Sequence, residues 1–132
     1  MNTKTIKGII FIALLVHGIG HIQGVICVFG VQFKESSSSI SWVLKGLGET
    51  PNRVLCILFF LTTAILSILT ALSFRDLLIS HNAVQGLALA TALLSSFSLI
   101  LFPRALAMFF NLAGALLVNV FLYWYVITDP DL

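Results

Sequence analysis

Two histidines, His17 and His21, stand four residues apart in an uncharged stretch of the chain. Residues at this spacing are neighbours on one face of a helix, so the two imidazoles are expected to lie side by side. Imidazole binds transition metals and haem iron, and it is the side chain that changes charge near neutral pH. We therefore take His17 and His21 as candidate metal ligands, and the same pair with Gly20 and Gly24 as the candidate cofactor-binding group.

Three roles for the histidine pair stay open. In the first, each imidazole hydrogen-bonds to a polar side chain on another helix, and no cofactor is bound. The polar residues available for this are Thr63, Ser67, Thr70, Gln85, Ser95, Asn111 and Asn119. In the second, the pair binds a transition metal such as zinc or copper, although zinc sites use more than two protein ligands. In the third, one histidine binds haem, with His81 as a second ligand from a shallower position. We expect no cofactor, and haem or a transition metal is the alternative.

Small residues share the helix face of the two histidines. Gly20 and Gly24 lie on this face, and small residues at such spacing let another helix approach closely. An imidazole without partners in an apolar interior costs roughly 2–7 kcal/mol. We therefore expect His17 and His21 to face protein or a cofactor, and we expect Gln23 to point away from their face.

Three amides in the later stretches are the other candidate site residues. Gln85, Asn111 and Asn119 are expensive to expose to hydrocarbon, so we expect them to lie between helices. Their predicted role is polar packing. The alternative is a substrate or cofactor cavity that Asn111 and Asn119 line together with His17 and His21.

The composition identifies the class of protein. Of the 132 residues, 59% are apolar and only 9% are charged, whereas soluble domains have about 25% charged residues. Such a chain cannot cover a soluble globule with charge, and it is too apolar to be disordered. A net charge of +2 is too small and scattered for nucleic-acid binding. The composition therefore predicts an integral membrane protein.

The charged residues divide the chain into four long uncharged stretches, at 8–33, 54–74, 77–103 and 105–128. About 20 apolar residues cross a membrane as a helix, so each stretch can cross once. We predict an all-α fold with a single domain, 1–132, in which four transmembrane helices form an up-down bundle. The expected helices span 6–33, 54–74, 80–102 and 104–127, with a long loop at 34–53. No Asp, Glu, Lys or Arg lies inside the four uncharged stretches, which excludes transport driven by a buried carboxylate.

The remaining features concern the ends of the helices. Trp42 could anchor a short interfacial helix in the long loop, or the loop could be plain. Tyr123, Trp124 and Tyr125 fit an aromatic belt at the end of the last helix. Cys27 and Cys56 are expected to be inert thiols, with a disulfide between them as the alternative. The basic residues divide almost evenly between the two ends, so the orientation stays open.

The block from Leu14 to Gly24, with the sequence LLVHGIGHIQG, resembles the first helix of a group of small bacterial and archaeal membrane proteins. Those proteins have four predicted helices and an HGxxHxxG-like motif. The Phe102-Pro103 junction and Asn119 in the last stretch are similar too. The resemblance implies the four-helix architecture and a role for His17 and His21, and it implies no reaction.

Three classes of function follow from these features. The first is an accessory or structural subunit that packs by its membrane faces against a larger complex or a second copy. The second is a haem or metal binder that uses His17 and His21 in electron transfer. The third is a small transporter or channel for an uncharged or weakly basic solute. We see no hydrolytic or redox motif and lean against an enzyme. The expected partners are membrane lipid and other membrane subunits, and the expected location is multi-pass, in the inner or cytoplasmic membrane of a prokaryote.

Overall fold

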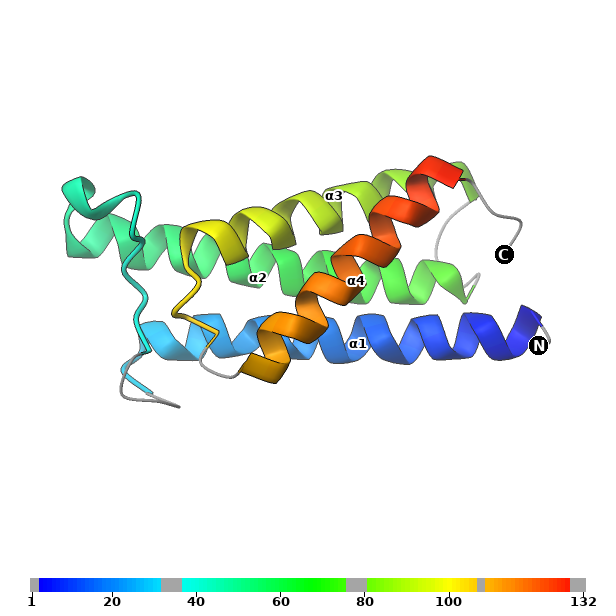
Figure 1. The fold of residues 1–132 in the computed structure, drawn as a ribbon, viewed down its shortest axis with the longest axis horizontal. Coiled ribbons are helices and arrows are strands. Elements are labelled where there is room, and N and C mark those ends of the chain that lie inside the picture. The colour runs from blue at the N-terminus through cyan, green and yellow to red at the C-terminus, as the bar shows by residue number, and fades with distance from the viewer. Residues whose placement is uncertain (1–2, 32–36, 76–80, 107–108, 129–132) are drawn as a thin grey trace.

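The protein is all-helical. The computed structural model describes residues 3–31, 37–75, 81–106 and 109–128. Its elements are α1 (Thr3–Val28), the short 3-10 helix η1 (Lys45–Leu47), α2 (Glu49–Phe74), α3 (His81–Leu101) and α4 (Phe109–Thr128) (Figure 1). All four α-helices are long and apolar enough to cross a membrane. The predicted all-α class and the count of four candidate spans are therefore confirmed.

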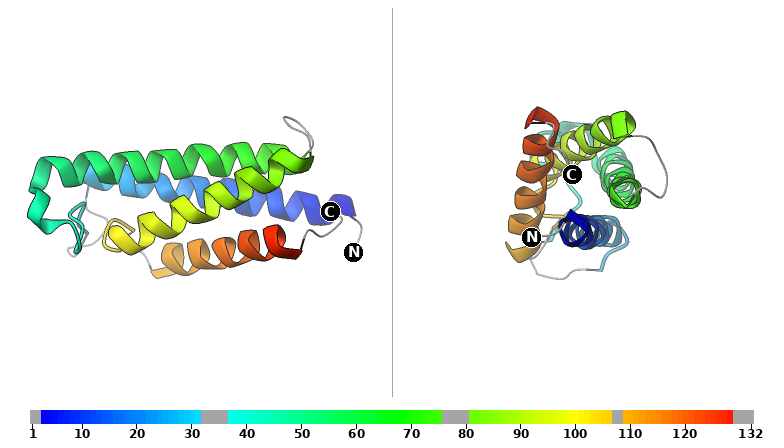
Figure 2. Two further views of the ribbon diagram at one scale, coloured as in Figure 1. Left: turned by 90° about the horizontal axis from the view of Figure 1, so that it is seen from above. Right: turned by 90° about the vertical axis from the view of Figure 1, so that its right-hand side faces the viewer.

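The helices form a ring in which each runs antiparallel to the next (Figure 2). Extensive contacts join α1 to α2, α2 to α3, and α3 to α4, whereas α4 meets α1 much more sparsely. The reason is visible in Figure 1, where α4 crosses α1 obliquely while α1 and α2 run side by side. Three seams of the ring are consequently tight, and the fourth, between α1 and α4, is loose.

The first helix ends earlier than predicted. It was expected to reach residue 33, because the chain stays apolar to that point, but α1 ends at Val28. Gly30 adopts φ 85°, and the amides of Phe29 and Gly30 bond back to Ile26 and Cys27. Glycine tolerates this left-handed conformation, which terminates a helix. The hydropathy of the sequence does not reveal a helix end of this kind.

The second helix begins earlier than predicted, at Glu49 and not at residue 54. Its added first turn is polar, so a search for apolar residues misses it. Pro51 suits this turn because its missing N–H has no intrahelical partner there. Glu49 places a negative charge at the positive end of the helix and pairs with Arg53 one turn later.

The last helix begins later than predicted. It was expected to start at residue 104, with Pro103 in its first turn, but α4 begins at Phe109. A turn follows α3 instead, in which the amide of Ala105 donates to the carbonyl of Phe102 at 3.0 Å. Phe102, Ala105 and Leu106 are buried. Apolar residues of a buried turn and of a helix look alike in sequence, which explains the error.

The long connection between α1 and α2 is held by one buried amide. The Asn52 side chain donates to the carbonyls of Leu44 and Gly48, at 2.9 and 2.7 Å, and accepts from the amide of Ser41 at 3.0 Å. The loop is therefore neither an interfacial helix nor a plain connection. Its only regular element among the described residues is η1.

Two clusters of buried apolar side chains form the core. The first draws on all four helices and comprises Ile10, Leu14, Ala71, Phe74, Val84, Ala88, Ala92, Leu122 and Tyr125. The second comprises Val28, Cys56, Phe60, Leu99, Phe102, Ala105, Leu106 and Ala115. The predicted aromatic belt is thus wrong for Tyr125, whose ring packs 4.8 Å from that of Phe74. Trp124 is exposed.

The tight seam between α1 and α2 depends on two glycines. A Cβ atom at Gly24 would lie 2.4 Å from the Phe60 ring, and one at Gly18 would lie 3.1 Å from the carbonyl oxygen of Ala64. At Gly20 a Cβ atom would meet nothing within 4 Å. The close helix contact expected at Gly20 and Gly24 therefore occurs at Gly18 and Gly24, and Gly20 faces open space.

We predict that Gly24→Ala lowers the free energy of unfolding by about 1–3 kcal/mol, the usual cost of overpacking, because the added methyl group collides with Phe60. The change is expected despite the roughly 1 kcal/mol by which alanine favours a helix over glycine. Gly20→Ala is the matched control and should leave stability unchanged or raise it. Thermal unfolding of the purified variants in detergent measures both, and equal stabilities would contradict the contact.

Candidate functional site

His17 and His21 lie side by side in the interior, as their spacing predicts. Their ring centroids are 4.6 Å apart, and the rings meet edge to face at 79°. Only 6% of His17 and 1% of His21 is exposed. The two imidazoles nevertheless have different surroundings, because His21 faces the centre of the bundle and His17 faces α4.

His21 joins two helices that have no direct backbone contact. Its Nε2 lies 3.0 Å from the hydroxyl oxygen of Ser95 on α3, and its ring packs 5.4 Å from that of Phe60 on α2. Ser95 is completely buried. The interhelical hydrogen bond predicted as one role for the pair is thus present for His21, with Ser95 as the partner among the seven candidates.

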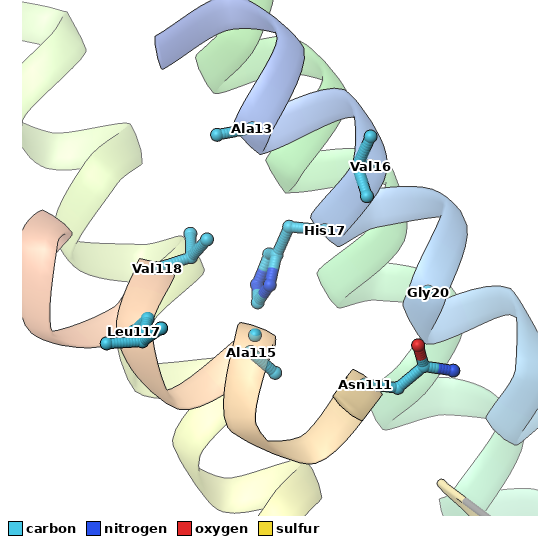
Figure 3. A pocket seen from close by; sticks show the side chains of 9 residues that line it. Ala13, Val16, His17, Gly20, Asn111, Ala115, Leu117 and Val118 are labelled. Carbon is cyan, nitrogen blue, oxygen red and sulfur yellow. The ribbon is translucent and has the colours of Figure 1, made fainter. Parts of the chain in front are cut away.

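His17 has no such partner. Its Nε2 is buried and makes no hydrogen bond within the described part of the chain. The ring projects from α1 toward α4, between Val118 and Ala115 (Figure 3). It borders a cavity of about 380 Å³. The other lining residues are almost all apolar or small, namely Ala13, Val16, Gly20, Asn111, Gly114, Ala115, Leu117 and Val118.

A second cavity of about 260 Å³ adjoins the first along the same seam. The two share Ala13, Leu117 and Val118. The second is further lined by Ile9, Ile10, Leu14 and Phe121. We call the two together the α1–α4 groove. It exists because α4 crosses α1 obliquely and because several residues that line it, such as Ala13, Gly20 and Gly114, are too small to fill the seam.

Of the four residues that were expected to line one cavity, His17 and Asn111 do so, and His21 and Asn119 do not. Asn111 lines the α1–α4 groove with His17, and its side-chain amide donates to the Gln23 side chain of α1. His21 and Asn119 lie elsewhere in the bundle. Asn119 donates to the Ser96 hydroxyl at 3.3 Å, and its own oxygen is buried without a partner among the described residues.

The other predicted site residues lie outside the groove or at its wall. Gly20 lines the groove, whereas Gly24 is covered by Phe60. Gln85 is half-buried on α3. Gln23 was not predicted as a site residue, although an amide inside an apolar stretch is itself a signal that a polar partner lies nearby.

The described residues offer a metal ion two imidazoles and no more, because no group of three or more His, Cys, Asp or Glu side chains occurs among them. Zinc sites use three or four protein ligands. For haem, His81 was the candidate second ligand, and its side chain lies outside the described residues. The backbones of α3 and α1 are not in direct contact. The geometry therefore favours neither group.

The cysteines do not form a disulfide. Cys27 and Cys56 are free and buried, and the Cys56 thiol lies 3.7 Å from the carbonyl oxygen of Gly24. This is the state expected of structural thiols.

Hydroxyl groups fill the seam between α2 and α3. Thr70 and Thr91 hydrogen-bond at 2.9 Å, and Thr63 and Ser98 at 3.3 Å. Each of the four hydroxyl oxygens also lies 2.7–2.8 Å from the carbonyl four residues before it. Because a hydroxyl has one hydrogen to donate, one member of each pair donates to its partner and the other donates to its own helix. These groups are completely buried and satisfy one another. The seam is a packed contact, which gives little support to a polar passage for a solute.

Comparison with family models, with curated proteins and with solved structures found no match. The resemblance of the first helix to small four-helix membrane proteins stays a prediction. The site is therefore interpreted from its own geometry.

We predict that disturbing the surroundings of His21 lowers stability and that replacing His17 does not. Ser95→Ala leaves the buried Nε2 of His21 unpaired and should lower the free energy of unfolding by about 1 kcal/mol. His17→Phe replaces an imidazole whose Nε2 makes no hydrogen bond. The phenyl ring has room in the groove, so stability should not fall. Unfolding of both variants by titration with SDS in mixed micelles measures the difference. A larger loss in His17→Phe than in Ser95→Ala would contradict this assignment.

Proposed function

We propose that the protein is a multi-pass integral membrane protein, in the inner or cytoplasmic membrane if its source is a prokaryote. Large apolar side chains point outward along every helix, including Ile12 and Val16 of α1, Leu58 and Ile65 of α2, Phe97 and Ile100 of α3, and Leu117 and Val120 of α4. Such a continuous apolar exterior suits lipid and not water. The charged residues that the structure describes lie in the first two turns of a helix or in the connections between helices, which suits the two membrane surfaces.

We further propose that the protein binds a neutral, lipid-soluble molecule in the α1–α4 groove. The observation that carries this proposal is the unpaired Nε2 of His17, which is buried at the wall of an otherwise apolar cavity. An unpaired buried polar group costs free energy, and a bound hydrogen-bonding ligand would remove that cost. The cavity of about 380 Å³ has the size of small-molecule sites, roughly 300–1,000 Å³.

The depth of His17 narrows the class of ligand. His17 lies ten residues after Lys7 and eleven before Val28 in one continuous helix, so about 15 Å of helix separates it from each of these two residues at 1.5 Å per residue. Headgroups of phospholipids stay at the membrane surface and do not reach this depth. The ligand would therefore be a molecule dissolved in the hydrocarbon interior.

The shape of the groove suggests how such a molecule would lie. The wall that borders His17 also contains Asn111, whereas the part that runs toward Ile9 and Phe121 is apolar. A ligand would place one carbonyl or hydroxyl oxygen at His17 and an alkyl or isoprenoid chain toward Ile9. Prenylated quinones and polyprenols have this chemistry.

A second candidate function is the accessory or structural subunit. The observation that favours it is the sparse contact between α1 and α4, because the helix of a partner could complete this seam. Such a helix would have to bring a polar side chain to His17 at the same depth. The partner would be another membrane subunit or a second copy of the chain.

We predict that purified protein binds decylubiquinone, and that His17→Phe weakens the binding about tenfold, the equivalent of one lost hydrogen bond. Decylbenzene has the same chain without the oxygens, so its binding should not change in His17→Phe. Gly20→Leu should abolish both interactions, because its side chain would extend into the groove. Quenching of intrinsic fluorescence in detergent measures the affinity for decylubiquinone, and competition with decylubiquinone measures the affinity for decylbenzene.

Gly86→Leu is the matched control. Gly86 is also a helical glycine with open space around it, but it lies on α3 outside the groove, so its variant should bind like the natural protein. If Gly86→Leu and Gly20→Leu lose binding equally, or if His17→Phe changes neither ligand, the proposed site is wrong.

The accessory role makes a separate prediction, which uses cysteines placed on exposed positions. Val16 borders the groove and Ile65 lies on α2, and both side chains are exposed. If a partner helix occupies the groove, Val16→Cys should cross-link to that partner in native membranes, whereas Ile65→Cys should not. Gel electrophoresis with mass spectrometry identifies the product. If Val16→Cys gives no cross-linked product, no partner helix occupies the groove.

A further inference from the structure

A separate pocket of about 130 Å³ lies where the long connection before α2 meets the turn after α3. It is lined by Ser38, Ile40, Trp42, Lys45, Pro103 and Arg104. The segments that form it are far apart in sequence and join at the end of the bundle opposite the start of α1. None of these residues belongs to the α1–α4 groove.

Two hydrogen bonds fix the walls of this pocket. The amide of Ser38 donates to the carbonyl of Arg104 at 3.1 Å. The indole N–H of Trp42 donates to the carbonyl of Ile100 at 2.6 Å. That carbonyl lies in the last turn of α3, where helix carbonyls lack intrahelical partners. The pocket is thus built by the fold and is not a chance gap between loose side chains.

The pocket presents hydrogen-bond donors and positive charge. Lys45 and Arg104 are both exposed cations, and neither forms an ion pair with a described carboxylate, since Glu49 pairs with Arg53. The hydroxyl oxygen of Ser38 accepts from the amide of Ile40 at 3.1 Å, which leaves its hydrogen available to donate. An ammonium, a guanidinium and a hydroxyl together match the oxygens of a phosphate group.

An apolar strip leads away from the pocket along α3. It consists of the exposed side chains of Ile100, Phe97, Leu93 and Leu89, which follow one another at helical spacing. Trp42 is held at the end of this strip that lies next to the pocket, by its bond to the backbone carbonyl of Ile100. A tryptophan in this position is typical of the membrane surface, where its ring lies at headgroup level. The pocket and strip therefore match a headgroup and its acyl chains.

We propose that this pocket binds the phosphate of an anionic phospholipid, with the acyl chains along the α3 strip. The inference rests on the proposed membrane location, but it does not depend on a ligand in the α1–α4 groove. Two cations near a membrane surface attract anionic lipid, and the fixed Trp42 and Ser38 would turn this attraction into a defined site.

The test is native mass spectrometry of the full chain, released from detergent with added POPG or POPC. The natural protein should retain POPG over POPC, and Lys45→Gln with Arg104→Gln should reduce POPG retention tenfold or more. Lys4→Gln with Lys7→Gln is the matched control, because it removes the same charge from the other end of the bundle. It should leave retention unchanged.

Three outcomes would overturn the proposal. Equal loss in the two double variants would mean that net charge and not the pocket attracts the lipid. Full displacement of POPG by millimolar inorganic phosphate would identify a free phosphate site. Equal retention of POPG and POPC would mean that no anionic site exists. A chain that fractionates away from membranes would instead refute the membrane location, and decylubiquinone binding reports separately on the groove.

Discussion

The close contact between α1 and α2 is the constraint on which the rest of the structure depends. Gly24 has no side chain, and the Phe60 ring occupies the space where one would lie. A glycine at such a position lets two helices approach closely. On its other side α1 meets α4, which crosses it obliquely. Small lining residues leave that seam unfilled, and the α1–α4 groove is the result.

Polar groups in the interior follow from this arrangement. The hydroxyls between α2 and α3 bond to one another and to their own helices, and His21 reaches Ser95 across the centre of the bundle. These contacts leave few polar atoms unsatisfied, as a low-dielectric interior requires. Among the described residues the exceptions are the Nδ1 of His21, the side-chain oxygen of Asn119 and the Nε2 of His17. Of these three residues, His17 lines the α1–α4 groove, which is where we propose that a ligand binds.

The sequence predicted the helices better than their ends. Long uncharged stretches predict helices reliably, because hydropathy is a property of composition along the chain. The ends depend on single events that composition does not record. Gly30 stops α1 by adopting a positive φ, and the polar first turn of α2 is held to the preceding loop by Asn52. The turn after α3 consists of apolar residues that are buried without being helical.

The sequence by itself determined the all-α class, four long uncharged stretches, and a histidine pair on one helix face. These are local properties that follow from residue type and from the 3.6-residue repeat of a helix. Only the tertiary structure decided that the Nε2 of His21 has a hydrogen-bond partner and that of His17 has none among the described residues. It also decided that Asn111 hydrogen-bonds to Gln23 and Asn119 to Ser96. Such pairings depend on the angles and distances between helices. Those are set by packing at a few small residues, and no short stretch of sequence contains both partners.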